Sequence, residues 1–268
     1  MRRAGRIVRR RALAVGLIGA VAAGVIGRTV LRQPSLVREW DEDVRVLSGV
    51  DSRSDGVVGL SDVRHWTYTR DSVVSKAYFA VDYDPEDVVG LWLYEQELGL
   101  GGLIAHTFLV FEFPERYGEG RWLGLSVETR REVGEEYSLL GGVLRDFEVT
   151  HIWAVEEDLV RRRVEYLDYP LTRYRVTIPP DQIAALFRQF TSETAALAAV
   201  PRWYNTLTTN CTSSLIRYAN AVKPGAIPPH YSSVLTGRAD VNLARLGYVD
   251  AGSAQPVTRA WLAEHPLR

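Results

Sequence analysis

Residues 203–214 read Trp203-Tyr204-Asn205-Thr206-Leu207-Thr208-Thr209-Asn210-Cys211-Thr212-Ser213-Ser214 and carry the only cysteine of the 268-residue chain. Apolar residues then recur at helical spacing as far as Val222, before Lys223-Pro224-Gly225. We therefore predict a polar turn followed by a helix, with Asn210 or Thr209 as the N-cap and Cys211 in the first helical turn. There, unpaired amide N–H groups and the helix dipole favour a thiolate. The alternative is a cysteine that serves as a small buried hydrophobic residue, and the polar residues flanking Cys211 argue against it.

The first 32 residues differ in charge from the rest of the chain. They contain eight arginines and no acidic residue, whereas residues 33–268 carry a net charge of −9. An acidic body argues against nucleic acid as a partner. Six of the arginines precede an uncharged apolar run over residues 12–27, a pattern typical of an export signal or signal anchor, with a buried core helix as the alternative. We therefore predict a single-pass inner-membrane protein with an extracytoplasmic (periplasmic) body. Its parts are a signal anchor over residues 1–32, a linker over 33–60 and a folded domain over 61–268.

The folded body has the pattern of strands first and helices later. Residues 103–113 are almost continuously apolar, which predicts a central strand covered on both faces. Residues 122–128 are expected to form the next strand, and Pro179-Pro180 opens an amphipathic helix. Further strands are expected over residues 147–154, 163–167 and 174–178. We predict an α+β fold with an antiparallel sheet and packed helices.

A thiol nucleophile needs a base, and histidine suits this role near neutral pH. His106 is the titratable group near the start of the apolar strand, where an unpaired imidazole would be costly, so we select it as the base. A structural histidine with satisfied hydrogen bonds is the alternative interpretation of His106. The other histidines look like surface residues or packed strand residues: His65, His151, His230 and His265.

The base in turn requires an acceptor that orients it. Glu128 on the following strand is the first choice, and Ser126 on the same face and Glu112 on the histidine's own strand are alternatives. For the oxyanion of an acyl-transfer intermediate, the helix N–H groups are available, and Asn210 or Tyr204 would add a side-chain donor. The sequence has no His/Cys cluster at metal-ligand spacing and no phosphate-binding glycine loop, so we expect neither a metal nor another cofactor.

Several of these pieces together resemble a known family. The chain is similar to the family named for the N-terminal periplasmic domain of Lnb-type lipoprotein N-acyltransferases, from about Ser61 to about Val222. The order of histidine strand, polar strand and cysteine helix is also similar to circularly permuted papain-like enzymes of the NlpC/P60 and lecithin:retinol acyltransferase types. The stretches that carry the resemblance are Val63–Tyr68, Ala105–Phe111, Leu125–Glu132, Tyr169–Leu171 and Trp203–Thr212.

The resemblance implies a permuted papain-like core with Cys211 as nucleophile, His106 as base and Glu128 as the orienting group. It further implies that an acyl chain is taken from phospholipid and passed to an amine, such as the N-terminus of a lipoprotein. Two other functions stay open: a cysteine peptidase or amidase acting on cell-wall peptides, and a non-catalytic envelope protein. A polar cleft lined by charged groups would favour the peptidase, and an apolar groove that opens toward the membrane would favour the acyltransferase.

Overall fold

The computed structural model describes residues 29–265 and Leu267, together with Gly16, Gly19, Gly24 and Gly27. The predicted signal anchor lies mostly outside the described residues. Within the described part of the chain, no helix is long and apolar enough to cross a membrane.

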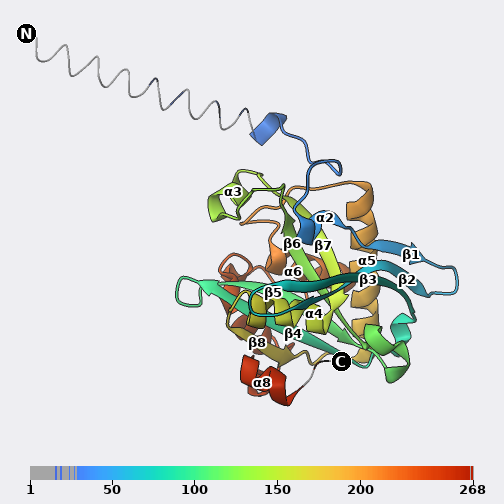
Figure 1. The fold of residues 1–268 in the computed structure, drawn as a ribbon. Helices are drawn as coiled ribbons and strands as arrows, with labels where there is room; N and C mark the ends of the chain where they lie inside the picture. Colours follow the sequence, from blue (N-terminus) through green and yellow to red (C-terminus); the bar gives the residue numbers. More distant parts are fainter. Residues whose placement is uncertain are drawn as a thin grey trace, which may run out of the picture.

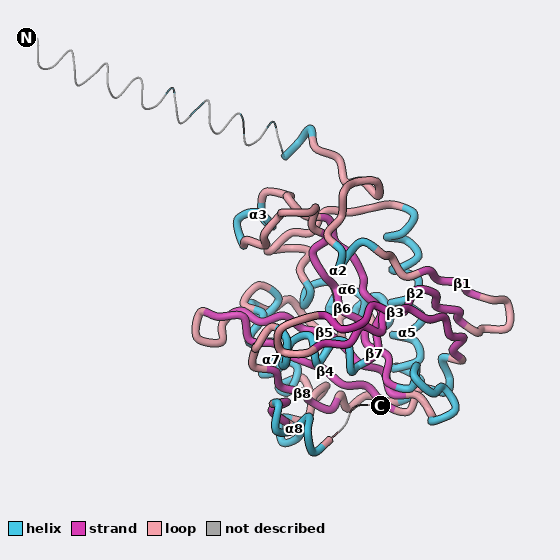
Figure 2. Tube along the Cα trace, in the orientation of Figure 1, coloured by secondary structure: helices cyan, strands magenta, loops and turns pink. Residues whose placement is uncertain are grey.

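A single mixed sheet forms the centre of the body (Figures 1 and 2). Across the described residues it has nine strands in the order β1-β2-β7-β6-β5-β4-β8-β9, and β3 also pairs with β2. The only parallel pair among these is β2 with β7; the other pairs are antiparallel. The strands are β1 (Gly49–Ser52), β2 (Val58–Tyr68), β3 (Val73–Tyr83), β4 (Gly90–Gly99), β5 (Ile104–Glu112), β6 (Trp122–Arg130), β7 (Glu148–Val155), β8 (Leu171–Arg175) and β9 (Gln255–Val257).

Helices cover both faces of this sheet. One core cluster joins the sheet to α5 and α6, and a second joins it to α4 and α8. The prediction of an α+β fold with a mostly antiparallel sheet and packed helices is therefore confirmed. The helices are α2 (Glu42–Arg45), α3 (Leu139–Val143), α4 (Glu156–Arg161), the π-helix η3 (Arg162–Tyr166), α5 (Pro180–Ala199), α6 (Cys211–Val222), α7 (Ala239–Arg245) and α8 (Arg259–Glu264), with short 3₁₀ turns η1 (Pro85–Asp87), η2 (Glu115–Arg121), η4 (Tyr231–Ser233), η5 (Thr236–Arg238) and η6 (Ala251–Ser253).

The central strand β5 shows why its sequence is so apolar. Phe108 belongs to the core cluster on one face, and Leu109 and Phe111 belong to the cluster on the other. Phe108 and Phe111 are fully buried, as expected for a strand covered on both sides. This packing fixes the position of His106 near the start of the strand and the face of the sheet on which its side chain lies.

Two segments differ from the expectations based on the sequence. Residues 163–167 were expected to form a strand, but Arg162–Tyr166 form the π-helix η3 that continues α4. The prediction was wrong because the short alternation of apolar and charged residues there fits both structures. Residues 33–60 were expected to be a linker, yet they contribute α2, β1 and the first residues of β2, and Trp40 and Val44 are buried against the body.

Candidate functional site

Helix α6 begins at Cys211, and its N-terminal turn is rigidly built. Asn210 is the N-cap, as predicted: its Oδ1 accepts from the Ser213 amide at 2.7 Å, and the Ser213 hydroxyl accepts from the Asn210 amide at 2.9 Å. Asn210 Nδ2 donates to the carbonyls of Thr206 and Ser233 at 2.9 and 2.8 Å. This capping box satisfies amides of the first turn and holds Cys211 at the start of the helix.

The Cys211 thiol is buried at the N-terminus of α6, next to the beginning of β5. Its sulfur lies 4.0 Å from the Ala105 carbonyl oxygen and 3.9 Å from Thr212 Oγ1. Burial raises the pKa of the thiol, but the charge and hydrogen bond of His106 and the amide of Thr107 more than offset it, so that the pKa falls to about 7. A thiol with this pKa is about half thiolate at pH 7 and mostly thiolate above pH 8.

His106 lies between this thiol and a carboxylate. Its Nε2 is 2.7 Å from Ser126 Oγ and 3.2 Å from Glu128 Oε1. Because Nε2 is engaged there, Nδ1 is the ring nitrogen left to exchange a proton with the sulfur. Burial lowers the pKa of His106, but the charges of Glu128 and Cys211 outweigh burial and raise it to about 9. Between about pH 7 and 9, thiolate and imidazolium are therefore the favoured pair.

The carboxylate comes from the neighbouring strand β6. The register pairs Phe108 with Ser126, which places Ser126 and Glu128 on the face of the sheet that carries His106. Ser126 Oγ donates to Glu128 Oε1 at 2.7 Å. Burial raises the pKa of Glu128, but the positive charges of His106 and Arg163 reverse this and hold it well below its usual range.

Arg163 is a member of this site that sequence reasoning missed. It is buried in η3, and its Nη2 donates to Glu128 Oε1 at 2.9 Å and to Ser126 Oγ at 3.2 Å. Its Nε and Nη1 are bound by Gln96 Oε1 and the Leu159 carbonyl. In the sequence, Arg163 stands in a run of three arginines, which gives no sign that one of them is buried.

The other residues considered from the sequence do not join the cluster of Cys211, His106 and Glu128. Glu112 lies at the far end of β5, where its carboxylate contacts Arg175 and Arg121, so it does not orient His106. His151 is buried between Thr194 and Tyr218, away from the thiol. The remaining histidines have other partners: His65 contacts Glu119, His230 contacts Ser232, and His265 contacts the Trp261 carbonyl.

Cys211, His106 and Glu128 line one cleft with a volume of about 320 Å³. Tyr204 and Asn210 line it too, but both Asn210 Nδ2 hydrogens are already donated to carbonyls. Burial and the nearby Cys211 raise the pKa of Tyr204, so its hydroxyl keeps its proton. Tyr204 is therefore the better side-chain donor for an oxyanion, together with the first amides of α6, which a helix leaves without intrahelical partners.

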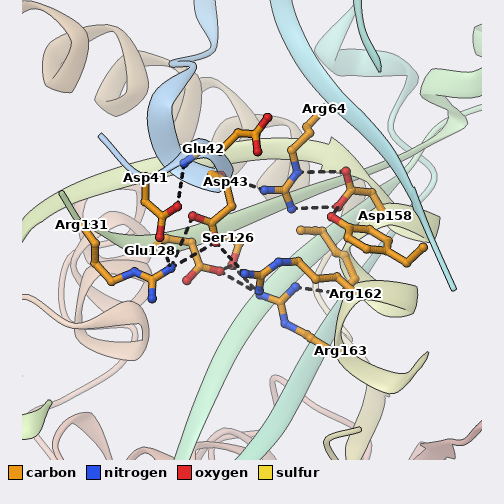
Figure 3. A network of polar contacts seen from close by, with 12 residues as sticks. Asp41, Glu42, Asp43, Arg64, Ser126, Glu128, Arg131, Asp158, Arg162 and Arg163 are labelled. Carbon is orange, nitrogen blue, oxygen red and sulfur yellow. Dashed lines mark hydrogen bonds and ion pairs between the residues drawn. The ribbon is translucent and has the colours of Figure 1, made fainter. Parts of the chain in front are cut away.

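One wall of the cleft is a network of charges (Figure 3). Arg64 donates two hydrogen bonds to the Asp158 carboxylate, at 2.8 and 2.9 Å. Arg162 and Arg131 both reach Asp43 of α2, at 2.6 and 3.2 Å. The network fastens the segment before the sheet to the wall of the cleft, and it makes that wall polar.

An apolar cavity of about 110 Å³ lies behind β5, between the sheet, α5, α6 and α7. Thr107 and Thr212 line it, and their hydroxyls are 3.0 Å apart. These two threonines are the neighbours of His106 and Cys211 in the chain, so the cavity approaches the thiol from the other side of the strand. Within the part of the chain that the structure describes, no group of three or more His, Cys, Asp or Glu side chains is arranged to hold a metal ion.

Fold and site together define a mixed α+β protein with a cysteine–histidine–glutamate cluster in a polar cleft. Residues 75–236 match the family model of the Lnb N-terminal periplasmic domain, and the chain belongs to this family. Its folded body is therefore an extracytoplasmic domain, and the resemblance noted in the sequence is confirmed. Comparison with curated proteins gave no match, and neither did comparison with solved structures, so the papain-like likeness stays a prediction.

Proposed function

We propose that this protein is a membrane-tethered, extracytoplasmic cysteine acyltransferase. Cys211 accepts an acyl chain from phospholipid as a thioester and passes it to an amine, such as the N-terminus of a lipoprotein. The observation that carries the proposal is the interaction of the Cys211 thiol with His106, whose other nitrogen is held by Glu128. A nucleophile, its base and the orienter of that base in one cleft are the parts that acyl transfer requires.

The chemistry divides into two steps that share the same base. In the first, the Cys211 thiolate attacks the ester carbonyl, the C–O bond breaks, and protonated His106 gives its proton to the departing lysophospholipid alcohol. In the second, the amine attacks the thioester while neutral His106 accepts a proton from it, and the C–S bond breaks to restore the thiolate. Amides of the first α6 turn and the Tyr204 hydroxyl stabilise the oxyanion in both steps. No cofactor is needed.

The test is intact-mass analysis of the full chain in vesicles of defined phospholipid, without an amine acceptor. Wild type should gain the mass of one acyl chain, and neutral hydroxylamine should remove it because thioesters are cleaved by hydroxylamine. The matched control is Cys211→Ser, which should show no hydroxylamine-labile adduct. Wild-type protein that stays unmodified under these conditions, with vesicle lipids intact, would contradict the proposal.

A second candidate, a cysteine peptidase or amidase for cell-wall peptides, is favoured by the charged wall of the cleft. Arg131 and Arg162 line the cleft and are only partly buried, which suits a charged peptide better than a hydrocarbon chain. The apolar cavity behind β5 favours the acyltransferase instead. Release of new amino groups from cell-wall peptides by wild type, but not by Cys211→Ser, would select the peptidase. Absence of both activities would leave a non-catalytic envelope protein.

A further inference from the structure

Helix α3 buries its glycines and exposes its apolar side chains to solvent. Gly141 and Gly142 are buried, whereas Leu140 is 67% exposed and Leu139 and Val143 are exposed as well. A Cβ on Gly142 would collide with the Thr206 hydroxyl, and one on Gly141 would lie 2.8 Å from Ser138 Oγ. The backbone of α3 therefore presses against the body, and its apolar side chains are turned outward, the reverse of an ordinary surface helix.

The turn before α6 adds one more outward apolar residue. Asn205 Nδ2 donates to the Val143 carbonyl at 3.3 Å, and Thr206 Oγ1 donates to the Leu139 carbonyl at 2.9 Å. Leu207, at the tip of this turn, is 49% exposed. Together these outward side chains form what we call the α3 patch: Leu139, Leu140, Val143 and Leu207.

The predicted signal anchor joins the body beside this patch. Arg32 is bound to Glu132 at 3.0 Å and to Asp146 at 3.7 Å, and its guanidinium lies over the Trp203 ring. Asp146 follows α3 by three residues. Figure 1 shows α3 and the start of the folded chain on the same side of the sheet. Since Arg32 lies five positions after Gly27, the end of the apolar run lies within about 18 Å of this point.

We propose that the α3 patch contacts the surface of the lipid bilayer and sets the mouth of the catalytic cleft against it. Apolar side chains that are exposed next to the anchor lose contact with water when they enter the interface, which stabilises one orientation of the body. Leu139 belongs to the patch and also lines the cleft, next to Tyr137. Leu139 therefore connects the patch to the lining of the cleft. The inference depends on the proposed membrane placement of residues 12–27 and not on thiol chemistry.

The test uses the full chain with Cys211→Ser, reconstituted in phosphatidylcholine–phosphatidylglycerol vesicles. Leu140→Cys and Leu207→Cys, each labelled with an environment-sensitive fluorophore, should be quenched at least twofold by brominated lipid. The matched control is Val89→Cys. Val89 is 50% exposed, and its amide donates to the carbonyl of Glu112, the last residue of β5. Glu112 pairs with Trp122, at the opposite end of β6 from Arg130, and a strand of nine residues spans about 27 Å.

Quenching at 140 and 207 that is no stronger than at 89 would overturn the proposal. So would labels at 140 and 207 that are shielded from water and unquenched by lipid, together with cross-linking between copies, because the patch would then join two proteins. All positions are exposed, so the substitutions should leave the fold intact, which circular dichroism checks. The background lacks the thiol, so these results stand apart from the acylation test: an unmodified wild-type protein would reject the acyltransferase and leave the membrane contact unaffected.

Discussion

Two histidines on central strands of one sheet have opposite electrostatic surroundings. His106 on β5 contacts a carboxylate and a thiol, and its pKa is raised to about 9. His151 on β7 contacts two hydroxyls, Thr194 Oγ1 at 2.8 Å and Tyr218 OH at 3.1 Å. Burial, followed by the positive charges of Arg202 and Arg217, lowers its pKa to about 3.

The difference shows that burial alone does not raise the pKa of a histidine. The side chains are 12% and 2% exposed, so both rings lose most of their contact with water. The two hydroxyls form hydrogen bonds with the neutral His151 ring. Neither of them carries a negative charge that would stabilise the protonated ring. The carboxylate on one side of His106 stabilises the protonated ring, and the thiol on the other side can exchange a proton with it.

The largest expected effect comes from exchanging each histidine for glutamine. His106→Gln should lower the rate of acyl transfer by about 10²–10⁴-fold, because the general base is lost. It should also raise the pKa of the Cys211 thiol from about 7, because burial is then no longer offset by a neighbouring cation. The measurements are the rate of acyl transfer and the thiolate absorbance at 240 nm as a function of pH.

His151→Gln is the matched control for that experiment. It should leave both the rate per folded molecule and the thiol pKa unchanged, since His151 does not line the cleft. A His151→Gln protein that is folded yet loses the thiolate at pH 8 would reverse the roles assigned to the two rings.

The second expected effect is on acid stability, and the sign differs between the two histidines. The pKa of His151 is lowered in the native state, so its contribution is present above the unfolded value of 6.5 and is lost as the pH falls toward 3. At pH 4.5 this loss should amount to about 3 kcal/mol. His106, with its raised pKa, contributes stability below pH 6.5 that is lost as the pH rises through about 9.

Chemical denaturation at pH 7.5 and 4.5 measures this effect. Wild type should lose about 3 kcal/mol more than His151→Gln between the two pH values. His106→Gln should instead lose more than wild type, because the stabilising contribution of His106 grows as the pH falls from 9 toward 6.5. Equal slopes for wild type and His151→Gln would mean that His151 accepts a proton in the native state, and the contrast between the rings would fail.

Much of the His106 side of this comparison could be predicted from the sequence. The polar turn, the N-cap and the helical spacing after Cys211 follow from local rules, and these fix the start of α6. The apolar run around His106 predicts a doubly covered strand, and alternation on the next strand places Ser126 and Glu128 on one face. These patterns are local, so one sequence suffices to read them.

The rest depends on contacts between distant segments. Arg163 reaches Glu128 because a π-helix after α4 folds back over the sheet, and nothing in its local sequence shows this. Asp43 meets Arg162 across 119 positions, so the segment expected to be a linker becomes part of the cleft wall. His151 and His106 are both histidines in apolar strands, and only the tertiary partners distinguish them.

The third prediction concerns Arg163 as a positioning residue. Arg163→Met keeps the length of the side chain but removes the positive charge that holds Glu128. The pKa of Glu128 should rise but stay below neutral, and the pKa of His106 should rise as well, because a neighbouring cation is removed while the carboxylate stays ionised. Glu128 is then held less firmly, so the rate should drop about 10-fold, and the basic limb of the pH profile should move above pH 9. The pH dependence of acyl transfer measures both.

Arg161→Met is the control for that change. Among the residues that the structure describes, Arg161 pairs only with Glu157 and Glu165, one helical turn away on either side, at 2.6 Å each. It should change neither the rate nor the basic limb. If Arg163→Met lowered the rate without moving the basic limb, the arginine would act through packing and not through the carboxylate. Arg163→Lys, which restores the charge, should return the limb toward its wild-type position.

The smallest expected effect comes from Ser126, which touches both members of the histidine–carboxylate pair. Its hydroxyl lies 2.7 Å from His106 Nε2 and 2.7 Å from Glu128 Oε1, yet the pair is also in direct contact at 3.2 Å. Removing the hydroxyl leaves the charge interaction in place, so Ser126→Ala should slow acyl transfer only by a few-fold, the usual worth of one hydrogen bond.

Ser214→Ala is the matched control, since the Ser214 hydroxyl is buried in α6 and has no hydrogen-bond partner among the described residues. It should leave the rate unchanged. A loss of 100-fold or more in Ser126→Ala would show that the imidazole is oriented through the hydroxyl and not by Glu128 directly. His106 would then resemble His151 in depending on a hydroxyl partner, and the carboxylate would act only through Ser126.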